Sequence, residues 1–125
     1  MKTVLEVLKI ARKRLASEKN WCKGSFHVHK GGIHAYCLLG ACGYRFETDP
    51  EIGDFDKAGI HTALVDAIRY VFSSTFSVTA FNDNKKRTYT DIIRVLDYAI
   101  TVESAPRLGD VDGYYSGTLE GAELL

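Results

Sequence analysis

The sequence of 125 residues predicts an α+β domain in which about three principal helices pack on a small antiparallel sheet. Three segments place apolar residues three and four positions apart, which is the period of an amphipathic helix. Residues 25–36 contain two short runs on either side of a Gly-Gly pair, a pattern typical of a β-hairpin. Residues 76–81 alternate polar and apolar side chains, so we expect an extended segment or strand that joins the hairpin.

The first helix is expected to begin after Thr3 and to end between Ser17 and Asn20. Thr3 and Glu6 stand three positions apart, the spacing of a capping box in which each side chain bonds the other residue's backbone amide. Apolar side chains then recur at helical spacing, at Val4, Leu8, Ala11 and Leu15. Most lysines and arginines of this segment fall away from that stripe, so one face is predicted to be buried and the other solvated.

The hairpin is expected next, after a bend that carries Trp21. Phe26 and Val28 alternate with polar neighbours, which predicts a half-buried first strand. The Lys30-Gly31-Gly32 turn tolerates positive φ, and residues 33–36 return as the second strand. In this arrangement two histidines lie on one face of the first strand and a third comes across from them; these are His27, His29 and His34.

Two contrasting segments follow the hairpin. Residues 37–43 are all small or apolar, which predicts one fully buried helical turn whose glycines let a neighbouring backbone approach closely. Residues 44–56 are acidic and are interrupted by Pro50 and Gly53, so we expect a loop there.

Two further helices are predicted in the second half of the chain. Residues 57–72 keep an apolar stripe at helical spacing. Thr88 and Asp91 form a second candidate capping box, and the helix that they begin is expected to end near Glu103 because Pro106 cannot continue it.

Residues 1–104 are therefore expected to form a single compact domain, and residues 105–125 an acidic C-terminal tail. After Pro106 the chain contains four glycines and four acidic residues, which favours irregular structure.

The composition is that of an ordinary globular protein: 46% of the residues are hydrophobic and 26% are charged. These values exclude a fully disordered chain, a collagen-like chain and a disulfide-rich peptide. No apolar run approaches the roughly 20 residues of a membrane-spanning helix, and the first residues lack the pattern of a secretory signal. Three cysteines without a C-x-x-C spacing indicate reduced, mostly buried thiols. We therefore expect a cytoplasmic protein with no membrane partner.

The formal net charge is zero, but the charges are unevenly distributed. Residues 1–31 carry eight basic residues and two acidic ones, whereas residues 105–125 carry one basic residue and four acidic ones. A basic region attracts phosphates locally even in a neutral chain. The alternative is that these cations form the solvated face of the first helix.

Three short motifs occur in an order that resembles a known family; they are Trp21-x-x-Gly24, Cys37-Leu38-Leu39-Gly40-Ala41, and Phe81-Asn82-Asp83 followed by Arg87-Thr88. The family consists of short bacterial and bacteriophage proteins catalogued as domain of unknown function 6197, and the resemblance covers residues 4–102. Phe81 stands where the family usually has Trp, and Lys85-Lys86 replaces its usual Pro or Gly turn. The resemblance implies a domain type and a bacteriophage origin, but no reaction.

The third motif is the main candidate for a binding site. Asn82, Asp83 and three following cations precede a predicted helix start, where unpaired amides attract anions. Arg87 could hold a phosphate through two hydrogen bonds, and Phe81 could stack on a base. The predicted ligand-binding residues are Trp21, Lys23, Phe81, Asn82, Asp83, Arg87 and Thr88. The alternative is that Asn82 and Asp83 bond their own turn and that Trp21 anchors the core.

Two chemical alternatives rest on the histidines and cysteines. His27, His29 and His34 could bind zinc, although their spacing matches no established zinc motif. Cys37 or Cys42 could act as a nucleophile with a histidine base, but both lie in the most apolar stretch of the chain, which disfavours a reactive thiolate.

The sequence therefore predicts a non-enzymatic binding protein without a cofactor. Its expected ligand is a small phosphate-bearing molecule such as a nucleotide signal, and no binding to duplex nucleic acid is expected. The alternatives are a homo-oligomeric protein-interaction module, most simply a homodimer, and a small metal-binding protein.

Overall fold

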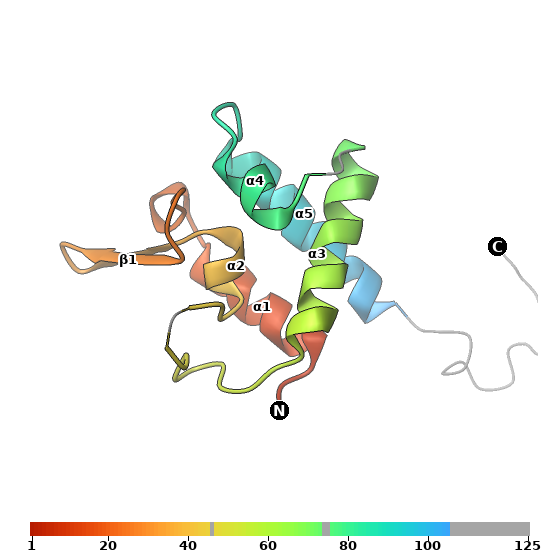
Figure 1. Ribbon diagram of the computed structural model, residues 1–125, viewed down its shortest axis with the longest axis horizontal. Helices are drawn as coiled ribbons and strands as arrows, with labels where there is room; N and C mark the ends of the chain where they lie inside the picture. The colour runs from red at the N-terminus through yellow and green to blue at the C-terminus, as the bar shows by residue number, and fades with distance from the viewer. Residues whose placement is uncertain (46, 74–75, 106–125) are drawn as a thin grey trace, which may run out of the picture.

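The α+β architecture is confirmed by the computed structural model, which describes residues 1–45, 47–73 and 76–105. Three long helices, α1 (Val4–Arg14), α3 (Lys57–Phe72) and α5 (Tyr89–Ser104), form the body of the molecule (Figure 1). Two short helices, α2 (Leu38–Ala41) and α4 (Val78–Asp83), lie against them. A two-stranded antiparallel hairpin, β1 (His27–Lys30) and β2 (Ile33–Tyr36), projects to one side.

The core lies between α1, α3 and α5, and α2 and α4 close one side of it. Fully burying a Leu, Ile or Phe side chain stabilises a fold by about 1.5–3 kcal/mol, so this cluster is the main source of stability. Its buried members are Val7, Leu8, Ala11, Leu15, Leu38, Ala41, Cys42, Ile52, Phe55, Ile60, Leu64, Ala67, Ile68, Val78, Phe81, Ile92, Val95, Leu96 and Ala99.

Both predicted capping boxes are present. Thr3 and Glu6 exchange hydrogen bonds at the start of α1, and Thr88 and Asp91 do the same at the start of α5. The predicted bounds of α3 and α5 agree with the structure, whereas α1 ends at Arg14, earlier than expected. A separate 3₁₀ turn, η1 (Glu18–Asn20), follows it.

The prediction of a strand over residues 76–81 is wrong, because most of this segment belongs to α4. The Ser77 side chain accepts a hydrogen bond from the amide of Ala80 and caps the helix. Val78, Phe81 and Asn82 are then buried at helical spacing, whereas Phe76 is 47% exposed. The periodicity of so short a segment does not distinguish a strand from one helical turn. The segment is helical because this conformation buries Val78, Phe81 and Asn82 together on one face. The sheet therefore keeps two strands within the described residues.

The hairpin has the predicted turn at Gly31 and Gly32, both with positive φ. Its strands pair His27 with Tyr36 and His29 with His34, so the histidines share one face, as the pattern predicted. Val28 is 37% exposed rather than half buried, because nothing in the described chain packs over that face of the projecting hairpin.

The buried turn at residues 37–43 forms α2 and supports the base of the hairpin. A Cβ atom at Gly40 would overlap the carbonyl oxygen of Phe26, so only glycine allows the two backbones to approach this closely. Cys37 and Cys42 are buried here, and all three cysteines are free, as expected.

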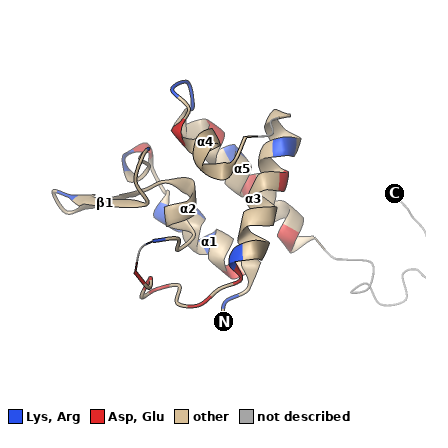
Figure 2. Cartoon of the chain, viewed as in Figure 1, with Lys and Arg blue, Asp and Glu red and all other residues tan. Residues whose placement is uncertain are grey.

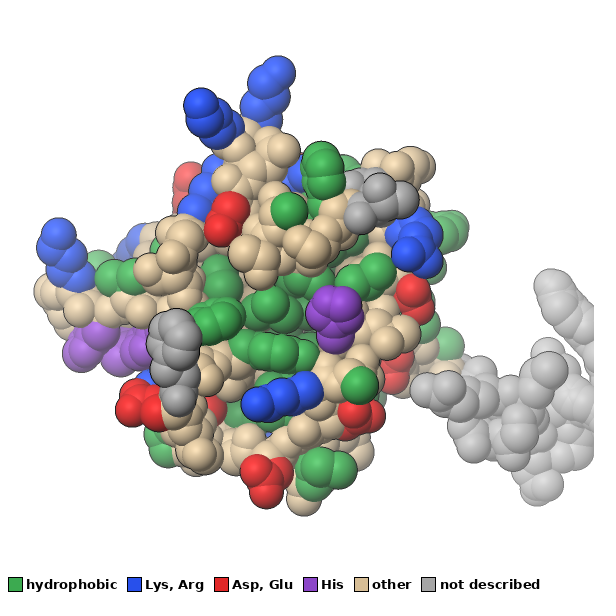
Figure 3. Space-filling view, viewed as in Figure 1, with side chains coloured by type: hydrophobic (Ala, Val, Ile, Leu, Met, Phe, Trp, Pro, Cys, Tyr) green, Lys and Arg blue, Asp and Glu red, His purple; other side chains and the backbone are tan. Residues whose placement is uncertain are grey.

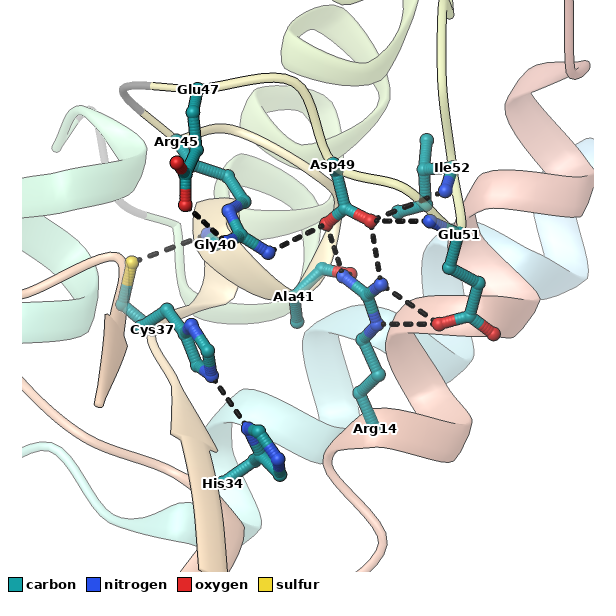
Figure 4. A network of polar contacts seen from close by, with 11 residues as sticks. Arg14, His34, Cys37, Gly40, Ala41, Arg45, Glu47, Asp49, Glu51 and Ile52 are labelled. Carbon is teal, nitrogen blue, oxygen red and sulfur yellow. Dashed lines mark hydrogen bonds and ion pairs between the residues drawn. The ribbon is translucent and has the colours of Figure 1, made fainter. Parts of the chain in front are cut away.

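The acidic segment 44–56 is fixed to α1 by ion pairs (Figure 4). The Arg14 guanidinium donates two hydrogen bonds to Asp49, at 2.8 and 2.9 Å, and two to Glu51. Asp49 also accepts the amide hydrogens of Glu51 and Ile52, and only 2% of its surface is exposed. Hydrogen bonds from Arg14 lower the pKa of Asp49 to about 2. These contacts hold the loop in one position below α2.

Lysine and arginine residues occur in several elements, and they are grouped in the turn between α4 and α5 (Figure 2). No helix in the described part of the chain is long and apolar enough to cross a membrane. The predicted tail, residues 105–125, lies outside the described residues except for Ala105.

Candidate functional site

A cavity of about 420 Å³ lies between the base of the hairpin, α2, the loop after α2, and α4. Its apolar wall consists of Phe26, Cys37, Leu39 and Val78. Polar groups line the remainder, namely Gly24, Ser25, His27, Arg45, Glu47, Thr79, Asn82 and Asp83. Figure 3 shows apolar side chains gathered in the middle of this face, between the hairpin and α3. A concave site with an apolar wall and a few converging polar groups is the usual form of a small-molecule pocket.

Asn82 joins the segments that surround this pocket. Its Oδ1 atom accepts hydrogen bonds from Trp21 Nε1 at 2.8 Å and from the Leu38 amide at 3.0 Å. Its Nδ2 atom donates to the carbonyl of Cys22 at 3.1 Å and to Asp83 at 2.9 Å. All four hydrogen-bonding positions of the side chain are thus used, and only 1% of the residue is exposed. Asn82 is a structural anchor that fixes the wall of the pocket.

Asp83 presents a carboxylate to the same pocket with one oxygen fixed. Its Oδ1 atom accepts hydrogen bonds from the Gly24 amide at 3.0 Å and from Asn82. Its Oδ2 atom makes no hydrogen bond or ion pair with any residue that the structure describes. The carboxylate is therefore oriented by the protein and keeps one acceptor for a ligand.

Arg45 supplies the positive charge of the pocket (Figure 4). It bonds Glu47 at 2.8 Å and lies 3.8 Å from Asp49, whose carboxylate is already bound by Arg14. The Arg45 side chain is only 19% exposed, whereas that of Glu47 is 76% exposed. Because the Glu47 carboxylate is exposed to solvent, a ligand phosphate can take its place on Arg45.

The three histidines stack on the hairpin face beside Arg45. His27 Nε2 lies 2.7 Å from His34 Nδ1, and the rings of His29 and His34 are 3.9 Å apart (Figure 4 shows His34). Burial, Arg45 and the other two histidines lower the pKa of His27, so its neutral form is favoured. Among the described residues no group of three or more His, Cys, Asp or Glu side chains could hold a metal ion.

The cysteines near the pocket are held as thiols. Cys37 Sγ accepts a hydrogen bond from the Gly40 amide at 3.3 Å, but burial raises its pKa overall. Burial also raises the pKa of Cys42 to about 12 and that of Cys22 to about 11. A neutral thiol is a weak nucleophile.

Of the predicted binding residues, only Asn82 and Asp83 line the pocket. Phe81 is fully buried, and the Arg87 guanidinium lies 3.7 Å above its ring. Arg87 also donates to the carbonyl of Phe81 at 2.9 Å and lies 3.6 Å from Asp91. Thr88 caps α5. The helix start at α5 thus uses its polar groups internally.

Trp21 and Lys23 hold the chain before β1 against the end of α4. Trp21 packs on the core and donates to Asn82, while Lys23 Nζ donates to the carbonyls of Asn84 and Lys85. Both residues stand beside the pocket and support its wall.

Sequence reasoning missed Arg45, Phe26 and Thr79 as pocket residues. The one available signal for Arg45 is its place between a wholly apolar turn and an acidic loop. Phe26 and Thr79 carry no local signal, because only the packing of α4 against the hairpin base brings them together.

A second, wider cavity of about 930 Å³ lies between α3 and α5. Small residues of α3, including Gly59 and Ala63, line it together with Tyr70 and Tyr98, whose rings stack on each other. None of the residues predicted to bind a ligand lines it.

No curated protein and no solved structure matches this chain. A model of a family of unknown function, DUF6197, matches residues 1–102, a range that includes α1 to α4 and every residue of the pocket at the hairpin base. The chain therefore belongs to the DUF6197 family.

Proposed function

We propose that this protein is a non-catalytic binding protein that holds a small phosphate-bearing ligand in the pocket between the hairpin base and α4. The observation that carries the proposal is the position of Arg45, a mostly buried cation that lines a cavity of about 420 Å³. A planar guanidinium binds phosphate through two parallel hydrogen bonds, and it does so most strongly where little water competes.

Arg45 is better suited to this role than Arg87. The Arg87 guanidinium is engaged by the Phe81 carbonyl, by Asp91 and by the rings of Phe72 and Phe81. The close partner of Arg45 is Glu47, whose carboxylate is exposed to solvent and can be replaced on Arg45 by a phosphate. The proposed ligand site therefore includes Asn82 and Asp83, as the sequence predicted, but its arginine is Arg45 instead of Arg87.

A binding role is favoured over catalysis because the thiol that lines the pocket is not activated. Burial raises the pKa of Cys37, so the thiol stays protonated at neutral pH. The free cysteines also fit a reducing compartment, and we infer a cytoplasmic location on that basis.

A thermal-shift titration at low salt tests the proposal, with inorganic phosphate and nucleoside monophosphates as probes. A ligand at about 100 times its Kd stabilises the native state by about 2.7 kcal/mol, which raises Tm by several degrees. Arg45→Ala should abolish the response. Arg69→Ala is the matched control, because Arg69 is 62% exposed on α3 and lies outside this pocket.

The proposal is wrong if no phosphate compound raises Tm, or if Arg45→Ala responds like the wild type.

The alternative of a homo-oligomeric module is based on the α3–α5 cavity, where Tyr70 is 72% exposed and Val102 is 48% exposed. That alternative would give an elution volume that depends on protein concentration and no response to phosphate.

A further inference from the structure

The charge of the pocket limits how many phosphates its ligand can carry. Among the described residues that line the pocket, Arg45 is the one permanent cation and Glu47 and Asp83 are carboxylates, so these residues have a formal charge of −1 when His27 is neutral. A single phosphate can take the place of Glu47 on Arg45. A chain of two or three phosphates would bring its extra charges close to the carboxylates of the same cavity, where repulsion is weakly screened.

The other end of the pocket is built to accept hydrogen bonds. Asp83 keeps its Oδ2 atom unpaired among the described residues, while its Oδ1 atom is fixed by Gly24 and Asn82. An oriented carboxylate binds a group that donates N–H or O–H, and such a charge-assisted hydrogen bond is stronger than a neutral one. Thr79 also lines the cavity.

Part of the pocket lining is apolar. Arg45 follows α2 and Asp83 ends α4, so different elements bring these two charged groups to the same cavity. Phe26, Leu39 and Val78 form an apolar wall of this cavity. A flat ring of a ligand would cover this wall while its two ends reach Arg45 and Asp83.

We infer that the ligand is a nucleoside monophosphate or a close analogue, with its one phosphate on Arg45 and an N–H or O–H donor on Asp83. This inference rests on the proposed function and adds the number of phosphates and the second recognition group. Guanine is the base that fits best, because its ring N–H and its amino group lie side by side and either one can donate to the free Oδ2 atom of Asp83. A sugar hydroxyl is the other source of the same chemistry.

Isothermal titration calorimetry of the wild type distinguishes these features without any substitution. GMP, AMP, ribose 5-phosphate, inorganic phosphate and GTP are the probes. GMP should bind at least about tenfold more tightly than inorganic phosphate, and GTP should bind more weakly than GMP. If GMP binds more tightly than AMP, the base is the donor to Asp83. If GMP and ribose 5-phosphate bind equally, the sugar is the donor.

Asp83→Asn then tests the second recognition group. Asparagine keeps an oxygen for the Gly24 amide but loses the charge, so GMP affinity should fall about tenfold while inorganic phosphate binds unchanged. Asp97→Asn, on an exposed residue of α5, is the control and should leave both affinities unchanged. A higher affinity for GTP than for GMP would overturn the inference, as would an Asp83→Asn variant that binds GMP like the wild type.

The two levels of the proposal fail differently. If no probe binds, the proposed function and this inference are both wrong. If inorganic phosphate binds through Arg45 while the identity of the organic part and the charge of Asp83 make no difference, only the inference is wrong.

Discussion

Replacing Asp49 by asparagine should destabilise the protein more than any other single loss of a carboxylate charge in the described chain. Asp49 is 2% exposed and accepts two hydrogen bonds from Arg14 and two from backbone amides. The Arg14 side chain is itself only 10% exposed. The asparagine side chain has an NH2 group in place of one carboxylate oxygen. This NH2 group would face the Arg14 guanidinium, and both groups are hydrogen-bond donors.

The expected loss follows from the pKa of Asp49. Its ordinary value of 3.8 falls to about 2 in the folded protein. Because one pKa unit corresponds to about 1.4 kcal/mol, the ionised form contributes about 2 kcal/mol to stability at neutral pH. Removing one partner of a buried ion pair costs about 3–5 kcal/mol, but Glu51 remains on Arg14 and reduces this penalty. We therefore expect Asp49→Asn to lose about 2–3 kcal/mol.

Urea unfolding followed by the fluorescence of the single tryptophan measures this loss. Asp97→Asn is the matched control, because it breaks an exposed pair with Arg12 and should cost about 0.5 kcal/mol or less. The pKa of Asp49 is lower in the folded state, so its contribution is complete above its unfolded pKa and is lost as pH falls through the folded value. The difference between wild type and Asp49→Asn should thus shrink by about 1 kcal/mol between pH 6 and pH 3.

An Asp49→Asn variant as stable as Asp97→Asn would refute the argument that the acidic loop is fixed by a buried ion pair. A difference that does not change between pH 6 and pH 3 would show that the charge of Asp49 is not the source of its contribution.

Two other substitutions test the local geometry. Gly40→Ala should destabilise the fold by about 3 kcal/mol or more in the same urea assay, because the new Cβ would overlap the Phe26 carbonyl. Gly32→Ala should cost only about 1–2 kcal/mol, because Gly32 has a positive φ but open space around it. Equal losses for the two variants would contradict the steric argument. The lowered pKa of His27 means that protonation is disfavoured in the folded state, so stability is complete above the ordinary pKa of 6.5 and declines as pH falls below it. His27→Asn should reduce the dependence of the urea midpoint on pH between about pH 7.5 and pH 5, and an unchanged dependence would show that His27 does not titrate as described.

The long helices could be predicted from the sequence because local signals agree with the packing. The capping residues Thr3 and Thr88 mark two helix starts, and the apolar stripes fix the buried faces. The hairpin could be predicted because Gly31 and Gly32 allow a turn that few other pairs allow.

The segment at residues 76–81 could not be assigned in this way. Its alternating pattern fits a strand, and its Ser77 cap and buried Val78 and Phe81 fit one helical turn. Tertiary packing of Phe81 against Phe72 and of Asn82 against Trp21 decides between them, and a single short segment does not encode these contacts.

The candidate site was predicted only in part for the same reason. Asn82 and Asp83 stand in a recognisable polar motif, but the motif gives no indication that Arg87 turns back onto Phe81. Arg45 lies far from that motif in the chain and reaches the pocket through the fold of the loop that Arg14 and Asp49 hold. The sequence thus identifies Asn82 and Asp83 as site residues, and only the structure identifies the positive charge of the pocket, Arg45.

The most direct test of the proposed site is the mapping of amide chemical shifts by NMR while a nucleoside monophosphate is added to the full chain. Our account predicts that the largest changes fall on residues 24–27, on Leu39 and Arg45, and on Val78, Thr79, Asn82 and Asp83, which line one cavity. Changes confined to Lys85, Lys86 and Arg87, or to the cavity between α3 and α5, would contradict it.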